Sequence, residues 1–196
     1  MTVPPTTTTQ PATTTTKVPY ESFFFGNMTE DAVYRTRTFN VPFTMQGQPD
    51  WKIAGELDEI VGLGKDIHPE DPQHMIRGFV VLGGRTDATP ESVVDEMLDT
   101  AVFDSITVVG NADVAGYPAI QISSEIRGDG QRFESLAFTS SEFQPFGTFT
   151  GVVQRWYVTD VAGRTVIVWI EAPVDQFDEW VLEAEAALAT LEFLSE

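Results

Sequence analysis

The 196-residue chain has no cysteine and little lysine or histidine. Without cysteine it can form no disulfide, no thiolate metal site and no cysteine nucleophile. Its only lysines are Lys17, Lys52 and Lys65, and 30 acidic residues stand against 11 basic ones, which gives a formal net charge of -19. A field of this sign repels phosphate backbones and anionic membrane surfaces, so we expect no nucleic-acid partner.

Long hydrophobic runs are also missing. The longest ones, such as residues 166–170, are far shorter than the roughly 18 to 20 residues that cross a bilayer, so we expect no transmembrane segment. Met1 is followed by Thr2, Val3 and Pro4 rather than by basic residues and an apolar stretch, and the sequence as given therefore shows no secretory signal. An exported protein would have lost that signal or would carry it upstream of Met1.

The N-terminal segment has a composition that does not fold. Residues 1–16 are almost wholly Thr, Pro, Ala and Gln, which bury too little apolar surface to offset the entropy of ordering them. We expect residues 1–22 to form a disordered leader or tether, and residues 23–196 to form a single α+β domain. Thr/Pro spacers commonly separate an anchor from a folded domain, which favours an extracellular or cell-envelope protein over the cytoplasmic alternative.

The first half of the domain shows strand signals and one clear helix start. Alternation from Phe39 to Met45 predicts a half-buried strand and the beginning of regular structure. Residues 76–82 predict a buried strand that Gly83 and Gly84 would stop, and Gly62 and Gly64 interrupt a weaker apolar stretch before it. Thr89 followed by Pro90 then predicts the capped start of a helix.

The second half predicts a run of strands and a closing helix. The strands are expected at residues 106–109, 119–126, 133–139, 152–159 and 165–170, with tight hairpins at residues 128–130 and 162–163. We expect Asp175 to cap the final helix, whose apolar positions recur at helical spacing. Those positions are Phe177, Trp180, Val181, Ala184, Leu188 and Leu191. The predicted fold is α+β, with an antiparallel sheet of about six strands flanked by helices and the C-terminal amphipathic helix packed on the sheet.

Several short motifs resemble one family. They are Val41-Pro42-Phe43 leading towards Trp51, Val114-Ala115-Gly116-Tyr117-Pro118-Ala119, Gly163-Arg164-Thr165-Val166, Ala172-Pro173 before Phe177, and Leu191-Glu192-Phe193. Between residues 39 and 193 the chain resembles bacterial cell-envelope lipoprotein domains with a PsbP-like fold, the LpqN-like domains. The resemblance implies an accessory domain that binds a ligand or partner, and it supplies no catalytic motif. The lipidated cysteine of the lipoprotein members is missing here.

An acidic loop contains both histidines of the chain. Asp66, His68, Glu70 and His74 offer carboxylate and imidazole ligands of the kind that bind zinc or another transition metal. Their spacing matches no known metal motif, and the alternative is a solvated acidic loop. No Gly-x-Ser-x-Gly elbow occurs, and only these two histidines could serve as a base for a serine nucleophile.

An aromatic segment is the other unusual feature. Phe143, Phe146 and Phe149 alternate with loop-forming residues rather than at strand spacing. Exposed aromatic loops tend to mark contact sites, so we expect these side chains to contact a ligand or partner; the alternative is that they cover one end of the core.

Two functions remain open. The first is a non-enzymatic, secreted or cell-envelope accessory module that binds a protein partner or small ligand and needs no cofactor. The alternative is a metal-dependent enzyme that uses the loop from Asp66 to His74. We favour the first because no nucleophile, base and orienting group can be named together.

Overall fold

A large antiparallel sheet forms the centre of the computed structural model, which describes residues 20–23, 25–66, 78–129, 132–139 and 147–195. The strands are β1 Tyr20–Ser22, β2 Gly26–Asn27, β3 Val33–Arg35, β4 Phe43–Gln46, β5 Trp51–Glu56, β6 Ile60–Lys65, β7 Gly78–Arg85, β8 Ser105–Val114, β9 Tyr117–Ile126, β10 Phe133–Ser135, β11 Gly147–Phe149, β12 Val152–Val161, β13 Arg164–Pro173 and β14 Glu192–Phe193. The helices are α1 Pro90–Asp99, the 3-10 turn η1 Ala137–Thr139, and α2 Phe177–Leu188.

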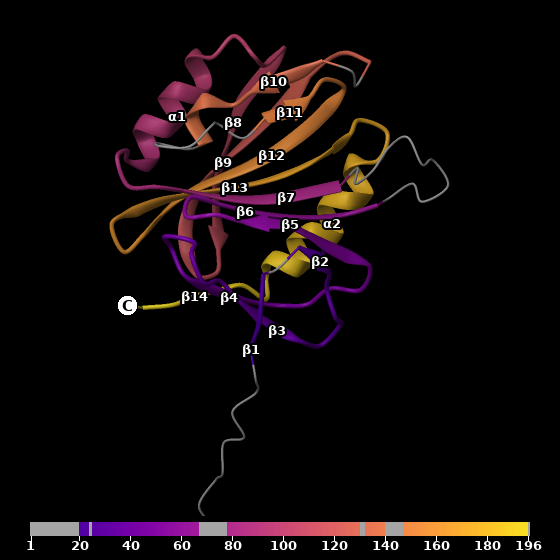
Figure 1. Cartoon of the computed structure of the whole chain (residues 1–196). Helices are drawn as coiled ribbons and strands as arrows, with labels where there is room; N and C mark the ends of the chain where they lie inside the picture. The colour runs from indigo at the N-terminus through magenta and orange to yellow at the C-terminus, as the bar shows by residue number, and fades with distance from the viewer. Residues whose placement is uncertain (1–19, 24, 67–77, 130–131, 140–146, 196) are drawn as a thin grey trace, which may run out of the picture.

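Three sheets arrange these strands (Figure 1). The main sheet has eight strands in the order β2-β5-β6-β7-β13-β12-β9-β8. A small sheet has the order β1-β3-β4-β14, and β10 pairs with β11 in a two-stranded sheet. The predicted α+β class is confirmed, with a main sheet larger than the expected six strands.

The central strands of the main sheet are buried on both faces. Along β13, Val166, Val168 and Ile170 belong to one hydrophobic cluster, while Ile167 and Trp169 belong to the other. The first cluster lies under α2 and the small sheet, and the second lies under α1 and η1 (Figure 1). A strand buried on both faces has a continuous apolar sequence, as residues 166–170 do.

Glycines inside β6 and β7 do not end strands, contrary to the prediction. Gly62 and Gly64 lie within β6, and β7 continues through Gly83 and Gly84 to Arg85. A Cβ on residue 84 would lie 2.1 Å from the Oδ1 of Asn40, so the missing side chain makes room for a neighbouring segment.

The expected hairpin at residues 128–130 does not form. Strand β9 pairs with β8 and β12, while β10 pairs with β11. Strand β12 pairs with β9 instead of β10 because it is longer. It matches β9 from Val152 opposite Ile126 to Thr159 opposite Ala119, whereas β10 ends after three residues. The expected turn at Ala162–Gly163 is confirmed, with positive φ at both residues.

Helix boundaries follow the predictions at α1 and differ at α2. Thr89 caps α1 with a reciprocal bond to Ser92, and Pro90 is the first helical residue. The N-cap of α2 is Gln176 and not Asp175. A backbone turn, in which the Gln176 amide donates to the Pro173 carbonyl at 3.0 Å, delays the helix by one residue.

Regular structure begins before Phe39, since β1, β2 and β3 precede it and Phe23 and Tyr34 are buried in the core. All six apolar positions predicted for the final helix are buried. Within the described residues, neither α1 nor α2 has the length and unbroken apolarity that a membrane-crossing helix needs.

Candidate functional site

The aromatic segment predicted as a contact site ends in a two-stranded sheet, β10 with β11, called here the aromatic ribbon. Phe149 is opposite Phe133 in this sheet, and their ring centroids lie 5.4 Å apart in an edge-to-face arrangement. Both rings are exposed, Phe133 to 55% and Phe149 to 53%. Phe143 and Phe146 lie outside the described residues.

The two exposed rings need a glycine beside them. A Cβ on residue 147 would lie 2.1 Å from Cζ of Phe133, so the Phe133 ring lies directly over the backbone of Gly147. With Gly147 and Phe149 both in contact with Phe133, the pair forms a continuous apolar surface on the outer side of the ribbon.

The inner side of the ribbon is held by a buried acid. Thr148 points opposite to Phe149, is 1% exposed, and hydrogen-bonds the carboxyl group of Glu171 in β13. Burial raises the pKa of Glu171 to about 6, and the hydrogen bonds from Gln154 and Thr148 oppose that rise. The ribbon is therefore attached to the main sheet by a polar contact inside the protein.

Glu171 belongs to a chain of buried hydrogen bonds that crosses three strands. Gln154 Nε2 donates to Glu171 Oε2 at 2.8 Å, and Ser124 Oγ donates to Gln154 Oε1 at 2.9 Å. Trp156 Nε1 completes the chain by donating to Ser124 Oγ at 2.7 Å. Each of these three buried hydrogen bonds joins two members of the series. The network therefore stabilises the strands beneath the ribbon.

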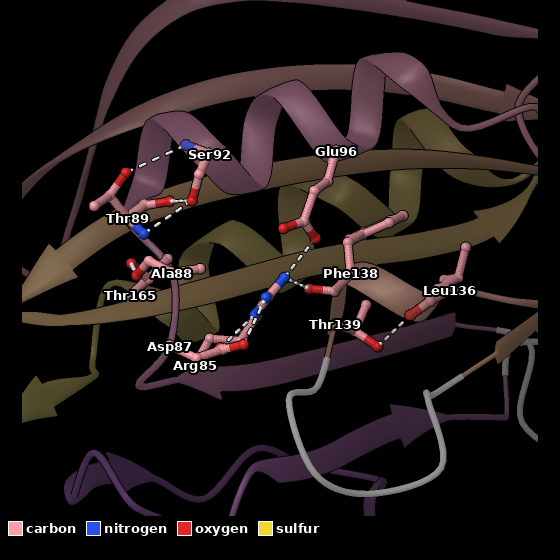
Figure 2. Close-up of polar contacts among 10 residues, drawn as sticks. All are labelled: Arg85, Asp87, Ala88, Thr89, Ser92, Glu96, Leu136, Phe138, Thr139 and Thr165. Atoms are coloured by element: carbon pink, nitrogen blue, oxygen red, sulfur yellow. Dashed lines mark hydrogen bonds and ion pairs between the residues drawn. The ribbon is translucent and has the colours of Figure 1, made fainter.

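A second polar cluster fixes η1, the turn that follows β10 (Figure 2). The buried guanidinium of Arg85 donates from Nε and Nη2 to both carboxylate oxygens of Asp87, at 2.9 and 3.0 Å. Its Nη1 donates to Glu96 of α1 at 2.6 Å and to the Phe138 carbonyl of η1 at 3.2 Å. The hydrogen bond from Arg85 lowers the pKa of Asp87. Arg85 thereby ties α1 and η1 to the end of β7.

One hollow of about 820 Å³ lies between α2 and the β5–β6 side of the sheet, and it contains Asp66, the one described member of the predicted metal set. Lys65 Nζ lies 2.9 Å from Glu183 Oε1, and Trp51 Nε1 donates to the same oxygen at 2.9 Å. His68, Glu70 and His74 lie outside the described residues. Among the residues that the structure does describe, no three His, Cys, Asp or Glu side chains are grouped to hold a metal ion.

Another hollow, of about 740 Å³, lies between the end of α2 and the β8–β9 turn. Arg155 Nη1 and the Tyr157 hydroxyl both donate to Glu185 Oε1 at 2.6 Å. Burial, with the hydrogen bond to Glu185, raises the pKa of Tyr157 above its usual value, so the phenol stays neutral. The three side chains satisfy one another and fix α2 on β12.

Comparisons with known proteins concern the fold alone. A scan against protein-family profiles finds no match, and a search of curated protein sequences finds none either. A structure of LpqN of Mycobacterium tuberculosis, described as involved in cell envelope biogenesis, aligns at 15% identity and a TM-score of 0.48, over 78% of this chain and 83% of LpqN.

A structure from Bacteroides thetaiotaomicron aligns at 15% identity and a TM-score of 0.43, over 79% of this chain. This chain spans 46% of that protein, less than half its length. At these identities and TM-scores the relation to both is distant.

Sequence reasoning found Phe149 but missed Phe133 and Glu171. The sequence predicts that the strand of Phe133 pairs with residues 119–126, and only the register of β10 with β11 brings Phe133 beside Phe149. Glu171 did have a signal, since it is a carboxylate that directly follows the apolar run of residues 166–170. An acid in that position of a central strand is buried and must find hydrogen-bond donors.

Proposed function

We propose that this protein is a non-enzymatic binding module of the cell envelope or the extracellular space, and that it contacts a protein partner through the aromatic ribbon. The observation that carries the proposal is the pair of touching, more than half exposed rings of Phe133 and Phe149. Aromatic side chains supply much of the binding energy at protein interfaces, because they bury large apolar area at a small cost in conformational entropy.

The attachment of the ribbon supports this proposal. Thr148 and Glu171 hold the ribbon from inside, and Arg85 holds η1, so the rings are presented on a fixed base. A surface that is already ordered loses less entropy on binding. The expected partner has an apolar patch surrounded by basic residues, since this chain carries a net charge of -19.

The polar clusters of the described residues favour binding over catalysis. The hydroxyl of Ser124, in the buried network, donates to Gln154 and accepts from Trp156. Neither of these partners can act as a general base for a serine nucleophile. Export is supported by the Thr/Pro composition of the leader and by the motifs shared with envelope lipoprotein domains.

A stability measurement tests first whether the rings are free to bind. In the double variant Phe133→Ser/Phe149→Ser, we expect the free energy of unfolding to fall by about 1 kcal/mol, the value of an exposed aromatic pair. Rings that were part of the core would cost about 3 to 5 kcal/mol each, and a urea melt showing such a loss would remove the ribbon as a contact site.

Site-specific photocrosslinking then tests for the partner. A benzoylphenylalanine placed at Phe149 in the full chain should form a discrete protein adduct in cells, whereas the same residue at Phe25, also exposed, should not. Excess wild-type protein should compete for that adduct, and the double serine variant should not. No adduct at Phe149, or the same adducts at both positions, contradicts the proposal.

A further inference from the structure

The two edges of the main sheet differ greatly in length. Strand β2 at one edge has two residues, and strand β8 at the other has ten. Very short edge strands offer few free backbone groups to another chain. Among the described residues β8 pairs only with β9, so one whole side of this strand presents N–H and C=O groups outward.

Most side chains of β8 are exposed to solvent, and those from Ser105 to Ala112 carry no charge. Residues 107–111 are exposed on both faces of the sheet, with Val108 exposed to 45% and Val109 to 58%. No charged residue occurs from Ser105 to Ala112, although 21% of the residues in the chain are charged. Charged side chains and proline are the usual means of protecting an edge strand, and β8 has neither in this stretch.

We propose that β8 pairs antiparallel with β8 of a second copy of this chain, so that the two main sheets join edge to edge about a two-fold axis. An antiparallel strand pair is compatible with such an axis, because the same segment then serves both sides of the contact. Outward backbone groups on each strand gain partners, and Val108 and Val109 lose exposed apolar area.

The uncharged stretch of β8 points to a second copy as the occupant. Two chains with a net charge of -19 each repel one another over most approaches. At β8 the facing residues are neutral, so this edge brings two copies together without opposing carboxylates at the centre of the contact. Repulsion from the rest of each molecule remains, and the dimer therefore strengthens as salt screens it.

A bulge limits the extent of the contact. The pairing of β8 with β9 shifts register between Val108 and Gly110, and Gly110 has a φ of 153°. Bulges bend a strand and interrupt its ladder. The bulge interrupts the ladder near the middle of β8, so each continuous run of paired residues is short, which makes the dimer reversible rather than permanent.

Sedimentation velocity of the full chain tests the proposal. From about 10 µM to about 1 mM protein, we expect a monomer–dimer equilibrium whose dimer fraction rises with concentration, and rises again between about 20 and 500 mM NaCl. Val109→Lys should weaken association at least about tenfold, because the axis places two like charges near each other. Val174→Lys is the matched control, since Val174 is exposed to 57% and the charge change is the same.

Amide hydrogen exchange localises the contact without any variant. Exchange of the β8 amides should slow as the wild-type concentration rises, while the rest of the main sheet stays unchanged. A monomer at every concentration and salt overturns the proposal, as does an equal effect of the two lysine variants. Protection of β8 that does not depend on concentration would show that a segment of the same chain covers it, and would overturn the proposal as well.

Discussion

Glu171 places a carboxyl group in a buried position beneath the aromatic ribbon. Its two hydrogen-bond donors, Gln154 and Thr148, come from β12 and β11. Burial penalises the ionised form more than these donors favour it, and the pKa therefore rises from 4.5 to about 6. Protonation of this single residue therefore removes the cost of a buried charge beneath a surface element.

The raised pKa predicts a specific loss of stability as the pH increases. A group whose pKa is higher in the folded state stabilises the fold below its unfolded pKa, and the contribution disappears as the pH rises through the folded value. For a shift from 4.5 to about 6, the loss between pH 4 and pH 8 is about 2 kcal/mol. In Glu171→Gln this loss should be absent, which urea melts at the two pH values would measure.

Other acids also titrate over this range, so the informative quantity is the difference between wild type and variant. Glu179→Gln, at an exposed position of α2, is the matched control and should keep the wild-type dependence. If Glu171→Gln and wild type depend on pH equally, the carboxyl group is not enclosed as described.

Arg85 acts at the scale of elements, because one side chain joins three of them. It lies at the end of β7 and contacts α1 through Glu96 and η1 through the carbonyl of Phe138. Asp87 and Glu96 are half exposed, so both carboxylates stay hydrated if the arginine is removed. The carbonyl of Phe138 would be left in a buried position.

Replacement of Arg85 by methionine should therefore destabilise the protein by about 2 kcal/mol, mostly through the buried hydrogen bond and the lost packing. Amide exchange should become faster in α1 and η1 before it does so in β12 and β13. Arg127→Met removes a pair with Glu125 at the surface and should cost at most about 0.5 kcal/mol. Equal costs for the two variants would show that Arg85 does not join these elements.

Local signals predicted some elements well. The cap at Thr89, the turn at Ala162–Gly163 and the apolar stripe of α2 each depend on residues within a few positions of one another. The continuation of β7 through Gly84 depends on Asn40, 44 residues earlier. The pairing of β10 with β11 likewise depends on a competition between β10 and β12 for β9, which no local pattern records.

At the scale of the molecule, charge works against compactness. A net charge of -19 on a chain of 196 residues makes self-repulsion part of the folded state. Ion pairs among the described residues include those of Lys65, Arg85, Arg127, Arg132 and Arg155. With 11 basic residues against 30 acids, such pairs can offset only part of the repulsion.

Salt should therefore raise the melting temperature. Between about 20 and 500 mM NaCl we expect an increase of about 2 to 4 °C by calorimetry, which corresponds to roughly 1 kcal/mol for a domain of this size. The same series near pH 4.2, the isoelectric point, should show little increase. A melting temperature that falls with added salt at pH 7 would mean that attractive pairs outweigh the repulsion.

The fold class followed from the order of strand and helix signals, whereas the candidate site followed only in part. Antiparallel pairing and a closing helix need no knowledge of distant contacts, but the surface made by Phe133 and Phe149 exists only once the register is known. The expected ligands His68, Glu70 and His74 stay predictions, since they lie outside the described residues.

The small sheet places β1 and β14 at its two edges, so the first and last strands of the domain lie at one end of the molecule, and the aromatic ribbon lies at the other (Figure 1). A reporter such as a fluorescent protein can thus be fused before β1 or after β14 and leave Phe133 and Phe149 uncovered. Immobilisation on a sensor chip through either end likewise turns the ribbon towards the solution, which makes the two orientations interchangeable in a binding assay.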